Sequence, residues 1–224
     1  MSRRLIAACV IACALGTLPP AAMAAKPPAS WDGLSLVKSQ RFDAAYLLPG
    51  ADFRAYTKVM LDPTEVAFEK NWLRDYNSSS MGTSRRISDA EGRQMLDMVR
   101  TGFEEAFRKA YAEAGYQVVA EPGPDVLRLR TAVLNLSVSA PDRGVGRSRT
   151  FTREAGGAMV VVEVRDSLSG ALLGRAVDGK LAGDTGTYLR SSISNRSDFM
   201  QMFRSWAKSS LEGLAELKAR SPIP

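Results

Sequence analysis

The sequence contains no histidine and only two cysteines among its 224 residues. Without histidine, no side chain has an unperturbed pKa near neutrality. This excludes Ser-His-Asp and Cys-His nucleophilic systems, histidine-ligated zinc and acid–base catalysis by histidine. Both cysteines, Cys9 and Cys13, lie in a stretch that we interpret as a leader. Once that leader is removed, the chain has no means to form disulfides, thiolate nucleophiles or cysteine-ligated metal sites, so its stability must come from packing.

Residues 1–24 have the pattern of a secretory signal peptide. Arg3 and Arg4 provide the positively charged start, residues 5–18 form an apolar run, and residues 22–24 (AMA) form a small-x-small cleavage site. The run is shorter than the roughly 20 residues that a spanning helix needs, and no later stretch is longer, so we predict no transmembrane segment in the mature chain. We therefore expect an exported protein in the periplasm of a bacterium.

Lipoprotein processing is a second interpretation of the same leader. Residues 10–13 (VIAC) loosely resemble a lipobox, and lipidation at Cys13 would leave the chain attached to a membrane. The apolar stretch before Cys13 is only about eight residues long, at the lower end of the range for a signal peptide. We favour cleavage after Ala24 and keep lipidation as the alternative.

The rest of the chain has the composition of an ordinary globular protein. Hydrophobic residues make up 45% and charged residues 24%, which excludes bulk disorder, collagen-like repeats and a polytopic membrane protein. We predict a short proline-rich tether over residues 25–30, a single domain over residues 31–220 and a C-terminal tail over residues 221–224.

Two segments have the periodicity of amphipathic helices. Ser88 and Glu91 fit a capping box, and apolar residues then recur at three- and four-residue spacing as far as Gly115, which predicts a helix over residues 89–114. A second apolar stripe follows a cap at Ser197 or Asp198. The large aromatic residues that we expect to join the two helices to the sheet are Phe103, Phe107, Phe203 and Trp206.

The remaining apolar segments alternate as strands do. The predicted strands cover residues 56–61, 116–120, 126–138, 158–166 and 171–178. Ser167 to Gly170 predicts a β-hairpin, and a change of apolar face in the long strand predicts a bulge near Thr131. The order of strand, helix, four strands and helix shows no βαβ alternation. The predicted fold class is therefore α+β, a mainly antiparallel sheet with two amphipathic helices packed on one face.

Residues 141–157 form the most unusual segment, because arginines there alternate with glycines around Phe151. Guanidinium groups bind phosphate in a bidentate manner, and glycines allow backbone N–H groups to approach it. This segment is a candidate for binding an anionic envelope surface, and a plain solvated connection between two strands is the simpler alternative. The candidate anion-binding residues are Arg143, Arg147, Arg149 and Arg153.

Acidic and aromatic residues suggest no catalytic motif. Carboxylates such as Asp62, Glu104 and Asp178 are scattered, whereas a paired-carboxylate hydrolase needs two of them facing one cleft. Cross-strand pairs such as Glu163 with Arg175 are the simpler interpretation. We predict no catalytic residues, no metal and no cofactor.

Early aromatic residues either line a hydrophobic ligand groove or hold an irregular N-terminal segment against the sheet. They are Trp31, Phe42, Tyr46, Phe53, Tyr56, Phe68, Trp72 and Tyr76.

Several short blocks form a recognisable pattern. They are residues 31–34 (WDGL), 46–53 (YLLPGADF), 59–63 (VMLDP), 66–68 (VAF) and 71–72 (NW), together with the hairpin residues 163–166 and 169–170. This pattern resembles the bacterial envelope proteins grouped as domain-of-unknown-function family 3313. The resemblance implies an exported, often lipid-anchored α+β protein with no established activity and no known catalytic residues.

These observations favour a non-catalytic accessory or binding protein of the cell envelope. Its expected partner is an envelope protein or an anionic envelope surface. The export signal and a net charge of only +6, which includes the two leader arginines, argue against nucleic acid. The alternative function is a periplasmic hydrolase with paired carboxylates.

Overall fold

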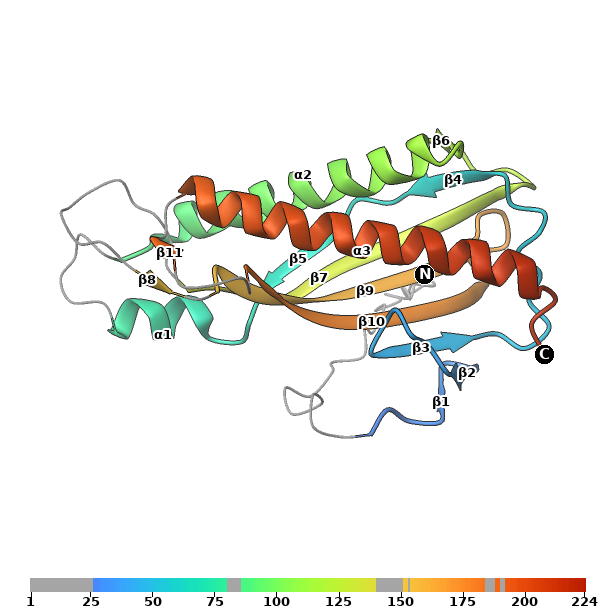
Figure 1. Ribbon diagram of the computed structural model, residues 1–224, viewed down its shortest axis with the longest axis horizontal. Coiled ribbons are helices and arrows are strands. Elements are labelled where there is room, and N and C mark those ends of the chain that lie inside the picture. Colours follow the sequence, from blue (N-terminus) through green and yellow to red (C-terminus); the bar gives the residue numbers. More distant parts are fainter. Residues whose placement is uncertain (1–25, 80–85, 140–150, 153, 184–187, 190–191) are drawn as a thin grey trace, which may run out of the picture.

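The computed structural model describes residues 26–79, 86–139, 151–152, 154–183, 188–189 and 192–224. Within these residues the fold is mixed α+β, with three helices, a nine-stranded sheet and a separate two-stranded pair (Figure 1). The predicted leader lies outside the described residues, as do Arg143, Arg147, Arg149 and Arg153.

The described elements follow one another along the chain with several short strands at the start. In order they are β1 (Ser30–Trp31), β2 (Leu34–Val37), β3 (Ala44–Leu47), β4 (Lys58–Leu61), β5 (Glu65–Phe68), α1 (Trp72–Ser79), α2 (Asp89–Glu113), β6 (Gln117–Val119), β7 (Val126–Val138), β8 (Phe151–Thr152), β9 (Gly156–Asp166), β10 (Leu172–Ala182), β11 (Tyr188–Leu189) and α3 (Ser192–Arg220).

The large sheet has the strand order β1-β2-β3-β10-β9-β7-β4-β6, and β5 pairs with β7 farther along that strand than β4 does. The sheet is mostly antiparallel, as predicted. The pairs β4–β6, β4–β7 and β5–β7 are parallel. β8 and β11 form the two-stranded pair.

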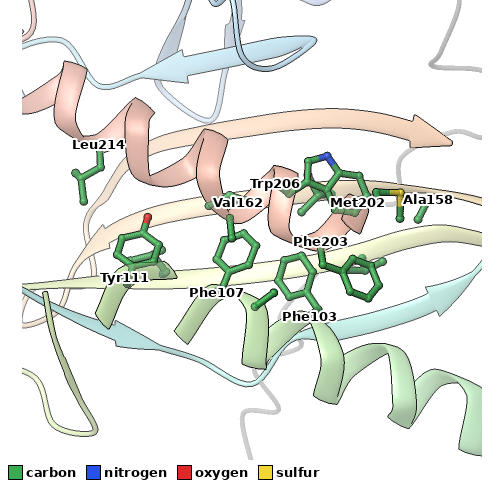
Figure 2. Close-up of a cluster of buried hydrophobic side chains, with 14 of the residues drawn as sticks. Phe103, Phe107, Tyr111, Ala158, Val162, Met202, Phe203, Trp206 and Leu214 are labelled. Carbon is green, nitrogen blue, oxygen red and sulfur yellow. The ribbon is translucent and has the colours of Figure 1, made fainter. Parts of the chain in front are cut away.

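Helices α2 and α3 lie side by side across the sheet (Figure 1). The four predicted core aromatics meet between them, and each is at most 2% exposed. Phe103 stacks on Phe107 with ring centroids 4.3 Å apart, and the ring of Phe203 lies 5.6 Å from Phe103 and 6.2 Å from Trp206 (Figure 2). This confirms the core prediction, and it explains how two helices with many polar residues stay on the sheet: the apolar stripe of each is buried.

The start of α2 is as predicted, and the start of α3 is not. At α2 the Ser88 side chain accepts from the Glu91 N–H and the Glu91 side chain accepts from the Ser88 N–H, while Gly115 takes a left-handed φ of +87° after the helix. α3 begins at Ser192, ahead of the predicted caps at Ser197 and Asp198. Ser, Asn and Asp recur through this region, so cap chemistry alone selects no single start.

The predicted β9–β10 hairpin is confirmed, with Gly170 at φ +72° in its turn. The predicted bulge near Thr131 is wrong in position. The register of β7 against β9 shifts between Leu134 and Ser137, at Asn135, whose φ is +52°. Thr131 instead faces the core, like Leu129 and Val133 on either side of it. Its hydroxyl lies 2.8 Å from that of the buried Thr64.

The predicted order of elements is also corrected. Five short strands and α1 precede α2, where the sequence suggested one strand and an otherwise irregular segment. β4 lies within the predicted strand over residues 56–61, whereas the other four strands, of two to four residues, contain too little alternation to identify. At the other end, Ile223 is buried, its N–H donates to the Ala51 carbonyl (2.9 Å), and its own carbonyl accepts from the Gly50 N–H (2.8 Å). Among the described residues, no helix is long and apolar enough to cross a membrane.

Candidate functional site

The cross-strand pair between Glu163 and Arg175 is present and forms the centre of a partly buried ionic cluster. Arg175 donates through Nη2 to Glu163 Oε1 at 2.7 Å, and its side chain is only 8% exposed. Arg165 donates to the other oxygen of Glu163 (2.9 Å). The Arg175 Nη1 donates to Asp32 Oδ2 at 2.8 Å, and the guanidinium lies 4.1 Å from the centre of the Trp31 ring.

The electrostatics of Glu163 indicate a structural role. Burial raises its pKa, but hydrogen bonds and charge from Arg175 and Arg165 outweigh that effect, so the pKa is lowered overall. A carboxyl group held ionised in this way is a poor proton donor. The cluster attaches the first strands, through Trp31 and Asp32, to the middle of the sheet.

A small cavity of about 110 Å³ brings two other carboxylates together, where the chain passes from β4 to β5 beneath α2. Asp62 and Glu104 both line it, but each has a structural partner. Asp62 accepts two hydrogen bonds from Arg128 Nε (2.9 and 3.0 Å), and Glu104 accepts from the N–H of the buried Thr64 (2.8 Å). Typical ligand pockets have about 300 Å³ or more, so this cavity favours a structural role.

The carboxylates of the hairpin are also engaged. Asp166 accepts from the N–H and hydroxyl of Ser169 (both 2.7 Å) and from the Tyr56 hydroxyl (3.0 Å). The backbone hydrogen bond from Ser169 is the main cause that lowers the pKa of Asp166, whereas burial raises the pKa of Tyr56 to about 12. Asp178 accepts from Trp206 Nε1 at 2.8 Å. Within the described part of the chain, no group of three His, Cys, Asp or Glu residues could hold a metal ion.

A larger hollow of about 380 Å³ lies beside α1, and we refer to it as the α1 hollow. One wall comes from the end of β5 and from α1, and the other comes from the end of β7. The residues of the first wall are Glu69, Lys70, Trp72, Asp75 and Tyr76, and those of the second are Ser137, Val138 and Ser139.

Trp72 and Tyr76 of the first wall continue a stack of aromatic rings that starts at Phe68, which does not itself line the hollow. Phe68 and Trp72 lie 4.6 Å apart with an interplanar angle of 17°, and Trp72 and Tyr76 lie 5.6 Å apart with an angle of 23°. A sharp turn at Asn71, with φ +66°, starts α1 directly after β5, so the three rings follow at four-residue spacing. Asn77 then holds the end of α1, because its side chain accepts from the Ile87 N–H (2.7 Å) and donates to the Ile87 carbonyl (2.8 Å).

The two walls are joined through the backbone. The N–H of Glu69 donates to the carbonyl of Leu136 at 3.0 Å, and the N–H of Ser139 donates to the carbonyl of Ala155 at 2.9 Å. Both walls are therefore extensions of the large sheet. The sequence singled out Trp72 and Tyr76 as aromatic residues, but not the polar residues of the hollow. Within α1, the four-residue spacing of Trp72 and Tyr76 was the available signal for their common face.

The α1 hollow has features that small-molecule sites share. Its size falls within the range of small-molecule sites, and aromatic rings lie beside carboxylates, an ammonium group and hydroxyls. Two carboxylates line it, but Asp75 has a side chain that is 62% exposed and an ion pair with Arg74 at 3.0 Å, and Glu69 is exposed. A general acid of a hydrolase needs a water-poor site that keeps it protonated, which neither residue has.

Comparison with known proteins gives one family match. A model described as "Protein of unknown function (DUF3313)" matches residues 28–210. A search of curated proteins finds no match.

Several solved structures are similar at low sequence identity. A PelC dodecamer from Paraburkholderia phytofirmans is 13% identical, covering 72% of this chain and 96% of that one with a TM-score of 0.30. A DUF330 protein from Xanthomonas campestris is 11% identical, covering 75% and 88% with a TM-score of 0.34. A minor lipoprotein from Acinetobacter baumannii is 11% identical, covering 74% and 94% with a TM-score of 0.32. None of these likenesses carries an argument about function.

Proposed function

We propose, starting from the fact that this chain belongs to the DUF3313 family, that it is an exported, non-catalytic accessory or binding protein of the bacterial cell envelope. The α1 hollow is the observation that carries the proposal of binding. It combines a concave surface of ligand size with aromatic and polar side chains that rest on the sheet. The pattern of the leader supports export.

The engaged carboxylates support binding over hydrolysis. Asp62, Glu104 and Glu163 each accept hydrogen bonds from a neighbouring arginine or backbone N–H, and these bonds hold the fold together. Paired-carboxylate catalysis needs one acid that stays protonated and one free base in the same cleft. If Glu69→Gln or Asp75→Asn abolished a measured turnover, the non-catalytic proposal would fail.

The compartment is tested by fractionating cells and determining the mature N-terminus by mass spectrometry. We expect a chain that starts at Ala25 in the periplasmic fraction. A diacylated Cys13 would instead identify a membrane-attached lipoprotein. An intact Met1 in the cytoplasm would contradict both forms of the proposal.

Binding at the α1 hollow is tested by photo-crosslinking in living cells. A crosslinking amino acid at Lys70, on the wall of the hollow, should capture an envelope component. The matched control replaces Lys109, whose side chain on α2 is 69% exposed and does not line the hollow. Equal capture from both positions would contradict the assignment of the site.

A further inference from the structure

The lining of the α1 hollow has a chemistry that selects among ligand classes. We propose that it binds a neutral, hydroxyl-rich glycan segment of the envelope. This inference rests on the proposed function, since it names the ligand class of the same site.

The aromatic rings beside the hollow lie in one stepped stack. Phe68 and Trp72 are within 17° of parallel and Trp72 and Tyr76 within 23°, with ring centroids 4.6 and 5.6 Å apart. A quaternary ammonium ligand prefers rings that surround it on several sides, which a parallel stack does not provide. A sugar ring has an apolar face of C–H groups, whose slight positive charge is attracted to the parts of the Trp72 and Tyr76 ring faces that the neighbouring ring does not cover.

Counted over the described residues, the charges at the hollow balance. Glu69 and Asp75 provide two negative charges, and Lys70 with Arg74, the ion-pair partner of Asp75, provides two positive charges. A site with no net charge has no long-range preference for an anion or a cation. The two carboxylates also disfavour a phosphate group, which distinguishes this hollow from the candidate arginine segment.

The hydrogen-bonding groups of the hollow match those of a sugar. Carboxylates of Glu69 and Asp75 only accept, the ammonium of Lys70 only donates, and the hydroxyls of Ser137 and Ser139 do both. Each hydroxyl of a sugar also donates and accepts, so neighbouring hydroxyls can use all three kinds of partner. A lipid tail could use none of them, and it would leave these polar groups without their water.

The test titrates the folded mature chain with soluble probes by calorimetry and by intrinsic tryptophan fluorescence, to which Trp31, Trp72 and Trp206 all contribute. The neutral probes are N-acetylglucosamine trimer and maltotriose, and the comparison probes are inorganic phosphate and tetramethylammonium. We expect saturable binding of at least one oligosaccharide and none of either ion. Tyr76→Ala should weaken that binding by about tenfold, which is the scale of one aromatic contact.

The matched control is Tyr116→Ala, which removes a half-buried tyrosine that contacts Tyr111 and does not line the hollow. It should leave the affinity unchanged. If Tyr76→Ala does not fold, the double variant Glu69→Gln and Asp75→Asn replaces it, because both side chains are exposed and their loss should spare the fold.

The outcomes separate the ligand class from the site itself. Failure of both oligosaccharides to bind, or equal loss of affinity in Tyr76→Ala and Tyr116→Ala, would overturn the glycan proposal. In that case, stronger photo-crosslinking from position Lys70 than from position Lys109 would still support binding at the hollow. Saturable binding of phosphate or tetramethylammonium in place of the sugars would overturn the glycan proposal in favour of an ionic ligand.

Discussion

Trp206 provides the sharpest test of how the helices are held on the sheet. Its side chain is fully buried, its ring lies 6.5 Å from Phe103 and 6.2 Å from Phe203, and its Nε1 donates to the buried Asp178 at 2.8 Å. Trp206→Ala therefore removes a large core side chain and a hydrogen bond at once. Figure 2 shows the indole between α3 and the sheet.

The two losses have separate magnitudes. Truncating a buried tryptophan to alanine costs about 3 to 5 kcal/mol, and a carboxylate that loses a buried partner costs roughly 1 to 3 kcal/mol more. Part of the second cost is offset, because Lys180 Nζ lies 3.5 Å from the same oxygen of Asp178. We expect Trp206→Ala to lower the free energy of unfolding by about 4 to 6 kcal/mol. At about 2 to 4 °C per kcal/mol for a chain of this size, the Tm falls by about 8 to 24 °C.

Thermal and urea unfolding followed by circular dichroism measure these changes. Trp206→Phe keeps an aromatic ring but loses the donor to Asp178, so it should cost clearly less than Trp206→Ala. The matched control is Met98→Ala on α2, because Met98 is 67% exposed and its truncation should stay within about 0.5 kcal/mol. A Tm shift of only one or two degrees for Trp206→Ala would refute the packing of α3 described above.

Two further predictions concern charged groups. Because the folded-state pKa of Glu163 lies below its usual value of 4.5, Glu163 stabilises the fold above that pH, and the stabilisation is lost as the pH falls through the folded-state pKa. Glu163→Gln should therefore lower stability at pH 7 and reduce the decline of stability below pH 4.5, as measured by urea unfolding at several pH values; an unchanged acid profile would contradict this. Replacing the four candidate arginines by glutamine should reduce salt-sensitive co-sedimentation with anionic liposomes or lipopolysaccharide, because each cationic side chain contributes about 1 kcal/mol near an anionic membrane. The Tm should stay nearly the same. Equal binding at low and high salt by the wild type and the variant, or no binding by either, would remove the segment from the function; the residues are Arg143, Arg147, Arg149 and Arg153.

Elements with many repeats of one periodicity were predictable from the sequence. α2 repeats its apolar spacing over 25 residues and has a capping box, and the predicted β7 matches the observed Val126–Val138. The β9–β10 hairpin has alternating strands on both sides of a turn that contains Gly170. β1, β2, β3 and β5 are too short for such a signal, and their pairing depends on partners far away in the chain, as when β3 joins β10.

The α1 hollow was predictable only in part, for the same reason. Trp72 and Tyr76 share a face of α1 by helical spacing, which the sequence shows directly, whereas Phe68 is the last residue of β5 and joins the stack through the turn at Asn71. Ser137 and Ser139 come from the end of β7, more than 60 residues later, and reach the hollow only because β5 pairs in parallel with β7. Nothing in the local sequence of either wall indicates that pairing.

The bulge at Asn135 connects the error in the sequence analysis to the candidate site. Before it, Leu129 and Val133 face the core; after it, Leu136 and Val138 do, because β7 contains one extra residue there. The left-handed φ of Asn135 suits asparagine, whose short polar side chain tolerates that conformation. Bulges often redirect side chains beside functional sites.

The partner strand has adapted to the same irregularity. Gly156 pairs with Val138, and a Cβ at Gly156 would lie 2.0 Å from the Ser137 carbonyl oxygen, so only glycine allows β9 to approach β7 there. Without the extra residue, strict alternation would have turned Ser137 toward the core and Leu136 away from it. The bulge thus keeps the core apolar and leaves Ser137 among the residues that line the α1 hollow.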